Sequence, residues 1–135
     1  SAIKSRTKDR KQSALKTIVG FLNTKGGILL IGVADDKSII GIEEDKLGDD
    51  LDKYMRSIDT DIKDRIGSEA DGKFNIKFQK TDNKTICRID CVAIHPDDRH
   101  AYLDEKLFFV RRAASSELKE GKEIQDYIRQ RRKEN

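Results

Sequence analysis

The chain of 135 residues has no tryptophan, one proline, one methionine and two cysteines, and only 6% of it is aromatic. Few aromatic side chains are therefore available to stack on the bases of a single-stranded nucleic acid. No apolar run approaches the roughly 20 residues that a membrane helix needs, and no secretory signal pattern is present. We therefore expect a cytoplasmic protein with no membrane-embedded part.

The two cysteines, Cys87 and Cys91, lie four positions apart in one predicted strand. A strand rises roughly 3.3 Å per residue, so they stand about 13 Å apart, too far for a disulfide. We expect both to be buried as small apolar side chains, which suits a reducing compartment. With 36% hydrophobic and 39% charged residues, the sequence predicts one domain over residues 1–135 with a densely charged surface.

Charge is distributed unevenly along the sequence, although the net charge is only +3. Residues 1–16 carry six Lys or Arg and one Asp, and residues 119–135 carry six Lys or Arg and four acidic residues, so both ends are basic. Residues 35–71 carry thirteen acidic and six basic residues. Such asymmetry indicates either a polyanion-binding face or an ordinary solvated surface, and the sequence leaves both open.

The spacing of apolar residues predicts the secondary structure. We expect helices over 8–24, 45–66 and 119–132, and strands over 27–33, 38–43, 73–80, 84–94, 101–103 and 106–112. The first strand is apolar without alternation, which predicts burial on both faces, and it is expected to form a hairpin with the second. The order α-β-β-α-β-β-β-β-α predicts a single α+β domain, in which three helices flank a mixed or antiparallel sheet.

Gly26 and Gly27 raise the question of a phosphate-binding loop. Such a loop leads from a strand into the N-terminus of a helix, whereas these glycines leave a predicted helix and enter a strand. Carbonyl groups at a helix C-terminus repel phosphate, and the pattern GxxxxGK followed by Ser or Thr occurs nowhere. We expect Gly26 to end the helix in the left-handed conformation, and Gly32 and Gly41 to allow other backbone to approach closely.

Asp35 and Asp36 follow the first strand, and two interpretations stay open for them. Aspartates favour turns because they bond to nearby backbone N–H groups. Alternatively, such a pair can help to hold Mg²⁺ or Mn²⁺ for phosphodiester cleavage, although only Asp9 precedes it to complete the site. His95 and His100 match no standard zinc-ligand spacing, so the sequence predicts no resident metal or cofactor.

Basic residues and hydroxyl groups gather near the end of the sequence. Arg111 and Arg112 end a predicted strand, and Ser115 and Ser116 follow them, a combination that can contact phosphate groups. The other candidate contacts are Lys25, Arg129, Arg131 and Arg132. If these residues and the basic N-terminus share one face, they form a cationic surface without elements that read base sequence.

Two motifs in this order resemble one protein family. They are LKTIVGFLNTKGGILLIGVADDKSIIGIEED, which a long predicted helix follows, and FFVRRAASSELKEGKEIQDYI. The match extends from about residue 14 to residue 129, and the motifs resemble the Schlafen/Alba-like DNA-binding domain family, also called the divergent AAA-type domain. The resemblance implies nucleic acid, above all DNA, as the partner, within a larger cytoplasmic protein such as a transcriptional regulator or a helicase-like protein.

Some animal members of this family are RNA endonucleases that use two glutamates before the first helix and an aspartate after the first strand. The resemblance places that aspartate at Asp35, with Asp36 beside it, whereas the start SAIKSRTK offers no counterpart of the glutamates. Such glutamates are absent from this member or precede Ser1. Three functions are therefore weighed: a non-catalytic nucleic-acid-binding module, a metal-dependent ribonuclease, and a protein-interaction or homo-oligomerisation module that uses the acidic helix over 45–66.

Overall fold

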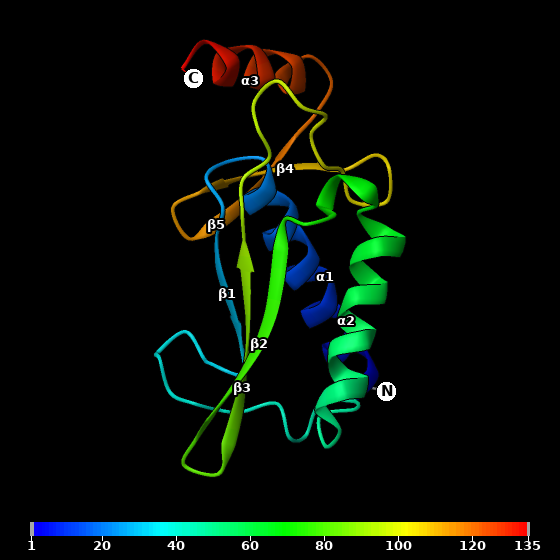
Figure 1. The fold of residues 1–135 in the computed structure, drawn as a ribbon, viewed down its shortest axis with the longest axis vertical. Coiled ribbons are helices and arrows are strands. Elements are labelled where there is room, and N and C mark those ends of the chain that lie inside the picture. The colour runs from blue at the N-terminus through cyan, green and yellow to red at the C-terminus, as the bar shows by residue number, and fades with distance from the viewer. Residues whose placement is uncertain (1, 135) are drawn as a thin grey trace.

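Three helices and two antiparallel sheets make up the fold of residues 2–134, the part of the chain that the computed structural model describes (Figure 1). Side chains are described for residues 9–134. The helices are α1 (Ala2–Leu22), α2 (Leu51–Arg65) and α3 (Lys122–Lys133), with a short 3-10 helix at Ser68–Ala70. The strands are β1 (Gly27–Ile31), β2 (Phe74–Thr81), β3 (Lys84–Cys91), β4 (Phe108–Arg112) and β5 (Ser115–Lys119).

The larger sheet has the strand order β1-β3-β2, and both pairs of neighbouring strands are antiparallel. The strands β4 and β5 form a separate antiparallel hairpin. The predicted α+β class is confirmed, but the strands divide between two sheets instead of joining one. As a result β1 and β2 are both edge strands of the larger sheet.

One hydrophobic core lies against the inner face of the larger sheet, with α1 passing behind the sheet and α2 beside it in Figure 1. The helical spacing of apolar residues in α1 aligns them on the buried side of that helix, and alternation does the same for β2. The aligned residues are Leu15, Ile18, Val19 and Leu22 of α1 and Phe74, Ile76 and Phe78 of β2. Each fully buried side chain of this kind stabilises the fold by roughly 1.5–3 kcal/mol.

Local signals set the ends of the first two helices. Gly26 has a φ of +72° and donates its N–H to the carbonyl oxygen of Phe21 over 2.8 Å, which closes α1 as predicted. Asp50 caps α2, because its side chain accepts a hydrogen bond from the N–H of Lys53 over 3.2 Å. The helix α2 therefore begins later than the predicted residue 45.

The predicted strand over 38–43 is wrong. Val33 and Ile39 form only an isolated antiparallel bridge. Gly32 and Gly41 have φ values of +100° and +80°, so neither arm of the expected hairpin stays extended. A Cβ atom built on Gly32 would lie 3.1 Å from the carbonyl carbon of Gly41, so these two glycines do approach closely.

Three further predictions about elements are wrong. Residues 101–103 contribute only an isolated bridge, whereas Ser115–Lys119, which the sequence analysis left outside any strand, forms β5. The strand β1 is not buried on both faces, because its side chains alternate and Ile28 and Leu30 are 51% and 46% exposed. Finally, α1 begins at Ala2 instead of residue 8.

Both cysteines are free and buried, as expected. Burial raises the pKa of the Cys87 thiol and of the Cys91 thiol to about 12. Neither thiol is therefore ionised at neutral pH, which agrees with a purely structural role. Within residues 2–134, no helix combines the length and the apolar character that crossing a membrane requires.

Candidate nucleic-acid interface

Arg111 lies where β4 packs against the C-terminal part of α1. Its backbone N–H donates to Oγ1 of Thr24 over 2.9 Å, and a Cβ atom on Gly20 would touch the same backbone at 3.4 Å. Its guanidinium lies over the ring of Phe21, 5.3 Å from the ring centre, and Nη1 donates to Oγ of Ser116 over 2.9 Å. Helix and hairpin together therefore hold this arginine in a fixed orientation.

The guanidinium of Arg111 also has a polar atom without a partner. Its Nε is buried and finds no acceptor in the part of the chain that the structure describes. A buried donor that is left unpaired costs about 1–3 kcal/mol, more when it is charged. An anionic acceptor that reached this atom would recover that free energy.

Arg112, Ser115 and Lys25 add exposed groups around Arg111. The side chain of Arg112 is 78% exposed, and its Nε lies 3.6 Å from a carboxylate oxygen of Glu117. Oγ of Ser115 donates to the carbonyl oxygen of Arg112 over 3.2 Å, which steadies the β4–β5 turn. Lys25 is exposed in the turn that leads from α1 into β1. The predicted residues Lys25, Arg111, Arg112, Ser115 and Ser116 thus belong to neighbouring elements at one end of the fold.

A buried asparagine that the sequence analysis did not single out fixes this corner. Nδ2 of Asn23 donates to the carbonyl oxygens of Ala101 and Phe109, over 2.8 and 3.0 Å, and Oδ1 accepts from the N–H of Ala101 over 2.8 Å. These bonds join the end of α1 to β4 and to the loop before it. In the sequence Asn23 lies between a predicted helix and a glycine turn, and this position does not indicate that it is buried. Only the structure shows that it joins α1 to β4.

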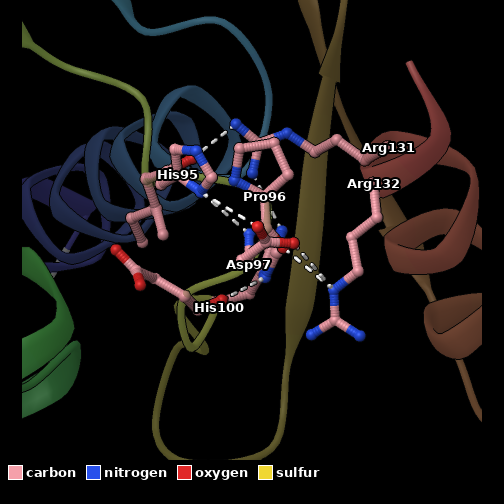
Figure 2. A network of polar contacts seen from close by, with 8 residues as sticks. His95, Pro96, Asp97, His100, Arg131 and Arg132 are labelled. Carbon is pink, nitrogen blue, oxygen red and sulfur yellow. Dashed lines mark hydrogen bonds and ion pairs between the residues drawn. The ribbon is translucent and has the colours of Figure 1, made fainter. Parts of the chain in front are cut away.

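The three arginines predicted in α3 play different parts. Arg131 points inward: Nη2 donates to the carbonyl oxygens of Thr24 and Ile94, over 3.0 and 2.5 Å, and Nη1 lies 2.9 Å from Nε2 of His100 (Figure 2). Arg132 donates from Nε to the carbonyl oxygen of Pro96 over 3.1 Å. Arg129 is exposed, and among the described side chains its one ionic neighbour is Asp126, at 3.8 Å on its own helix.

His100 is neutral because of the groups around it. An arginine can only donate, so Nε2 of His100 accepts the hydrogen bond from Arg131, and Nδ1 carries the proton that faces the carbonyl oxygen of Asp98. Burial, reinforced by the positive charge of Arg131, lowers the pKa of His100 from its usual 6.5 to about 4. Both ring nitrogens of this histidine are therefore engaged, and its bond to Arg131 anchors α3.

The basic N-terminus does not join this corner. In Figure 1 the N-terminal end of α1 lies beside α2, at the opposite end of the molecule from α3. Arg10 lies 3.4 Å from Asp45, and Lys11 lies 3.1 Å from Asp61 of α2. Arg10 and Lys11 therefore do not meet the condition that the basic N-terminus shares this face, and the acidic segment neutralises part of their charge. The basic side chains of residues 1–8 lie outside the described side chains.

Comparison with known proteins identifies the family to which the chain belongs. The sequence model described as "Schlafen, AlbA_2" matches residues 2–120. The chain belongs to the Schlafen, AlbA_2 family. The resemblance inferred from the two motifs is thereby confirmed.

A solved structure shows the same fold as this Schlafen, AlbA_2 domain. It is the crystal structure of the DIP2311 protein from Corynebacterium diphtheriae, with a TM-score of 0.62 and 19% sequence identity. The match covers 90% of this chain but only 19% of that one. At this identity the likeness shows the fold alone. No curated protein matches the chain.

Among the described side chains, the aspartates at the position that nuclease-type family members use are not part of a cluster of metal ligands. Oδ1 of Asp36 accepts from the N–H and from Oγ of Ser38, over 2.9 and 2.6 Å, and these bonds lower the pKa of Asp36. That is the turn role weighed for the pair. Asp35 lines a cavity of about 540 Å³ between α1, β1 and α2. Within the described side chains, no group of three His, Cys, Asp or Glu comes together as metal ligands.

Proposed function

We propose that this Schlafen, AlbA_2 domain is a nucleic-acid-binding module, with DNA as its preferred partner, within a larger protein such as a transcriptional regulator or a helicase-like protein. The observation that carries the proposal is the guanidinium of Arg111. It is held on Phe21 and Ser116 with an unpaired Nε, beside the exposed Arg112 and Lys25. The guanidinium of Arg111, the hydroxyl of Ser116 and the neighbouring cations together suit a phosphate group as the acceptor.

The remaining contacts come from the exposed arginines of α3. Arg129 and Arg132 extend the cationic surface, and their ionic neighbours at 3.8 and 3.9 Å are exposed pairs that a phosphate can outcompete. We leave Arg131 out of the contact set, because its bonds to Thr24, Ile94 and His100 hold α3 in place. Ser115 and Ser116 support the arginines and can donate to phosphate oxygens.

The proposed contacts predict how binding depends on salt. Five cationic side chains contact the backbone in this proposal, namely Lys25, Arg111, Arg112, Arg129 and Arg132. If all five neutralise phosphates, the logarithm of the affinity falls with the logarithm of the salt concentration with a slope of roughly −4.5 for duplex DNA. Little dependence on base sequence is expected, because the proposal includes no element that enters a groove.

Fluorescence anisotropy with a labelled DNA duplex at several salt concentrations tests the proposal. The variants Arg112→Gln and Lys25→Gln should each reduce the magnitude of the slope by about 1. The matched control is Lys80→Gln, since Lys80 is exposed on β2, in the hairpin that extends away from α3. An unchanged slope in both test variants, or an equal loss in the control, would contradict the proposed surface.

A further inference from the structure

We propose that the free edge of β1 pairs with β1 of a second copy of this chain, which extends the three-stranded sheet into a continuous six-stranded one. This goes beyond nucleic-acid binding and rests on other observations. The strand β1 is an edge strand, bonded to β3 on one side only. An unpaired strand edge is a template for another strand, because its N–H and C=O groups have no partner.

The hydrogen-bond pattern shows which backbone groups face that edge. The N–H of Val92 donates to the carbonyl oxygen of Lys73 over 2.8 Å, in the register of β2 and β3. Even-numbered residues of β3 therefore bond to β2, and odd-numbered residues bond to β1. In β1, Gly27, Leu29 and Ile31 stand opposite the odd-numbered residues, so the backbone groups of Ile28 and Leu30 point outward.

The same two residues expose their side chains. Ile28 and Leu30 are 51% and 46% exposed on the outer face of the sheet. No charged residue and no proline lies within Gly27–Ile31, although these are the usual protections of an exposed edge. Within residues 2–134, no other segment pairs with Gly27–Ile31 on this side, and residues 38–40 pair only with residues 32–34, where β1 has ended. The strand therefore offers an uncharged, apolar and unpaired edge.

Charge complementarity identifies a second copy as the occupant. Lys25 stands just before β1, and Asp35 and Asp36 stand just after it. Antiparallel pairing of two identical strands brings the beginning of one beside the end of the other. Lys25 of each copy then faces the aspartates of the other copy, and the two-fold axis makes both contacts equivalent.

The outward backbone groups also fix the register. Ile28 of one copy stands opposite Leu30 of the other, with the two-fold axis at Leu29, so that four backbone hydrogen bonds form between the copies. In this register the exposed side chains of Ile28 and Leu30 become cross-strand neighbours. Lys25 lies diagonally from Asp35 of the second copy, within reach of its flexible side chain. Gly32 is not needed for pairing, and its carbonyl oxygen already accepts from the N–H of Ile40.

Sedimentation equilibrium of the full chain, without nucleic acid and up to about 1 mM protein, tests the proposal. We expect a dimer, and we expect Leu30→Lys to raise its dissociation constant at least about tenfold, because two added charges meet across the axis. The matched control is Met55→Lys: Met55 is an exposed apolar residue of α2, at 37% exposure, and should leave the dimer unchanged. Circular dichroism confirms that each variant is folded.

A charge swap tests the antiparallel arrangement itself. Lys25→Glu and Asp35→Lys should each weaken the dimer, and the double variant should restore it. A wild-type chain that stays monomeric throughout overturns the proposal. A dimer that Leu30→Lys leaves intact also overturns it and would point to another surface, such as the acidic α2. The third contrary result is a double variant whose dimer is no tighter than the dimers of the single variants. Self-association is measured without nucleic acid, and Leu30 is not among the proposed DNA contacts, so the Leu30→Lys result is read independently of the DNA titration.

Discussion

Nη1 of Arg131 lies 2.9 Å from Nε2 of His100, which joins α3 to a loop 31 residues earlier in the chain. No side chain of α3 is fully buried, so polar contacts carry much of its attachment. The hydroxyl of Tyr127 adds a bond to the carbonyl oxygen of Asn23 over 2.7 Å. The position of the α3 arginines in the proposed interface therefore depends on a histidine that must stay neutral.

Stability should fall when the solution is acidified toward pH 4. The pKa of His100 in the fold, about 4, lies below its usual value of 6.5, so the unfolded chain binds more protons between these values. Stability is complete above about pH 6.5 and declines by about 3 kcal/mol as the pH falls to 4. Urea unfolding at several pH values measures this decline. His100→Gln should decline less steeply, and an equal decline in both proteins would contradict the assignment.

Arg131→Lys should loosen α3. A lysine cannot reproduce the planar fork that reaches Thr24, Ile94 and His100 together, so buried carbonyl oxygens lose their donor. We expect amide hydrogen exchange in α3 to accelerate by at least about tenfold, with the rest of the fold little changed. Arg129→Lys, a similar change at an exposed position of the same helix, is the control. Equal protection of α3 in both variants would contradict an anchoring role for Arg131.

Asn23→Ala should destabilise the whole fold. The substitution leaves Ala101 N–H and the carbonyl oxygens of Ala101 and Phe109 without partners in a buried place, at about 1–3 kcal/mol for each uncompensated group. We expect a loss of about 3 kcal/mol in the free energy of unfolding, measured with urea. Asn75→Ala, at an exposed position of β2, should change stability by less than about 0.5 kcal/mol.

Sequence patterns predicted the elements whose signals are local. Helical spacing in α1 and α2 and alternation in β2 follow from which side of each element is buried, and the turn of Asp82 and Asn83 between β2 and β3 has the positive φ values that such hairpins need. The strand β5 escaped prediction because its sequence, SSELK, is largely polar, and only its pairing with β4 makes it a strand. The same limit applies to β1, whose apolar run gives no hint that it lies at an edge.

The sequence indicates which candidate residues are cationic but not what each of them contacts. The sequence singled out Arg111, Arg112, Arg129, Arg131 and Arg132 alike as cationic, because charge is visible in a sequence and burial is not. In the folded protein Arg131 belongs to a partly buried hydrogen-bond network, whereas the side chain of Arg112 is 78% exposed. The anchor Asn23 escaped notice for the same reason, since its three bonds join segments 78 and 86 residues away.

Gly32 and Gly72 both have positive φ values, but only Gly32 lies close to other backbone. Comparing alanine substitutions at the two positions therefore tests how much this close approach adds to the loss of stability. Gly32 has a φ of +100°, and a Cβ atom there would lie 3.1 Å from the carbonyl carbon of Gly41 and 3.3 Å from the carbonyl oxygen of Thr85. Gly72 has a φ of +70° and open space around it. Both positions carry the conformational cost of an L-residue, which is about 1–2 kcal/mol at the left-handed φ of Gly72 and no smaller at the larger φ of Gly32. Only at Gly32 does the added Cβ atom also force backbone apart.

We therefore expect Gly32→Ala to cost more than Gly72→Ala by at least about 1 kcal/mol in urea unfolding. The added displacement falls on the segment after β1, which holds Asp35, the residue proposed to face Lys25 of a second copy. Gly32→Ala should for that reason also weaken self-association, whereas Gly72→Ala, in the connection before β2, should not. Equal losses of stability in the two variants would show that backbone conformation alone requires glycine at position 32, and that the contact with Gly41 can relax.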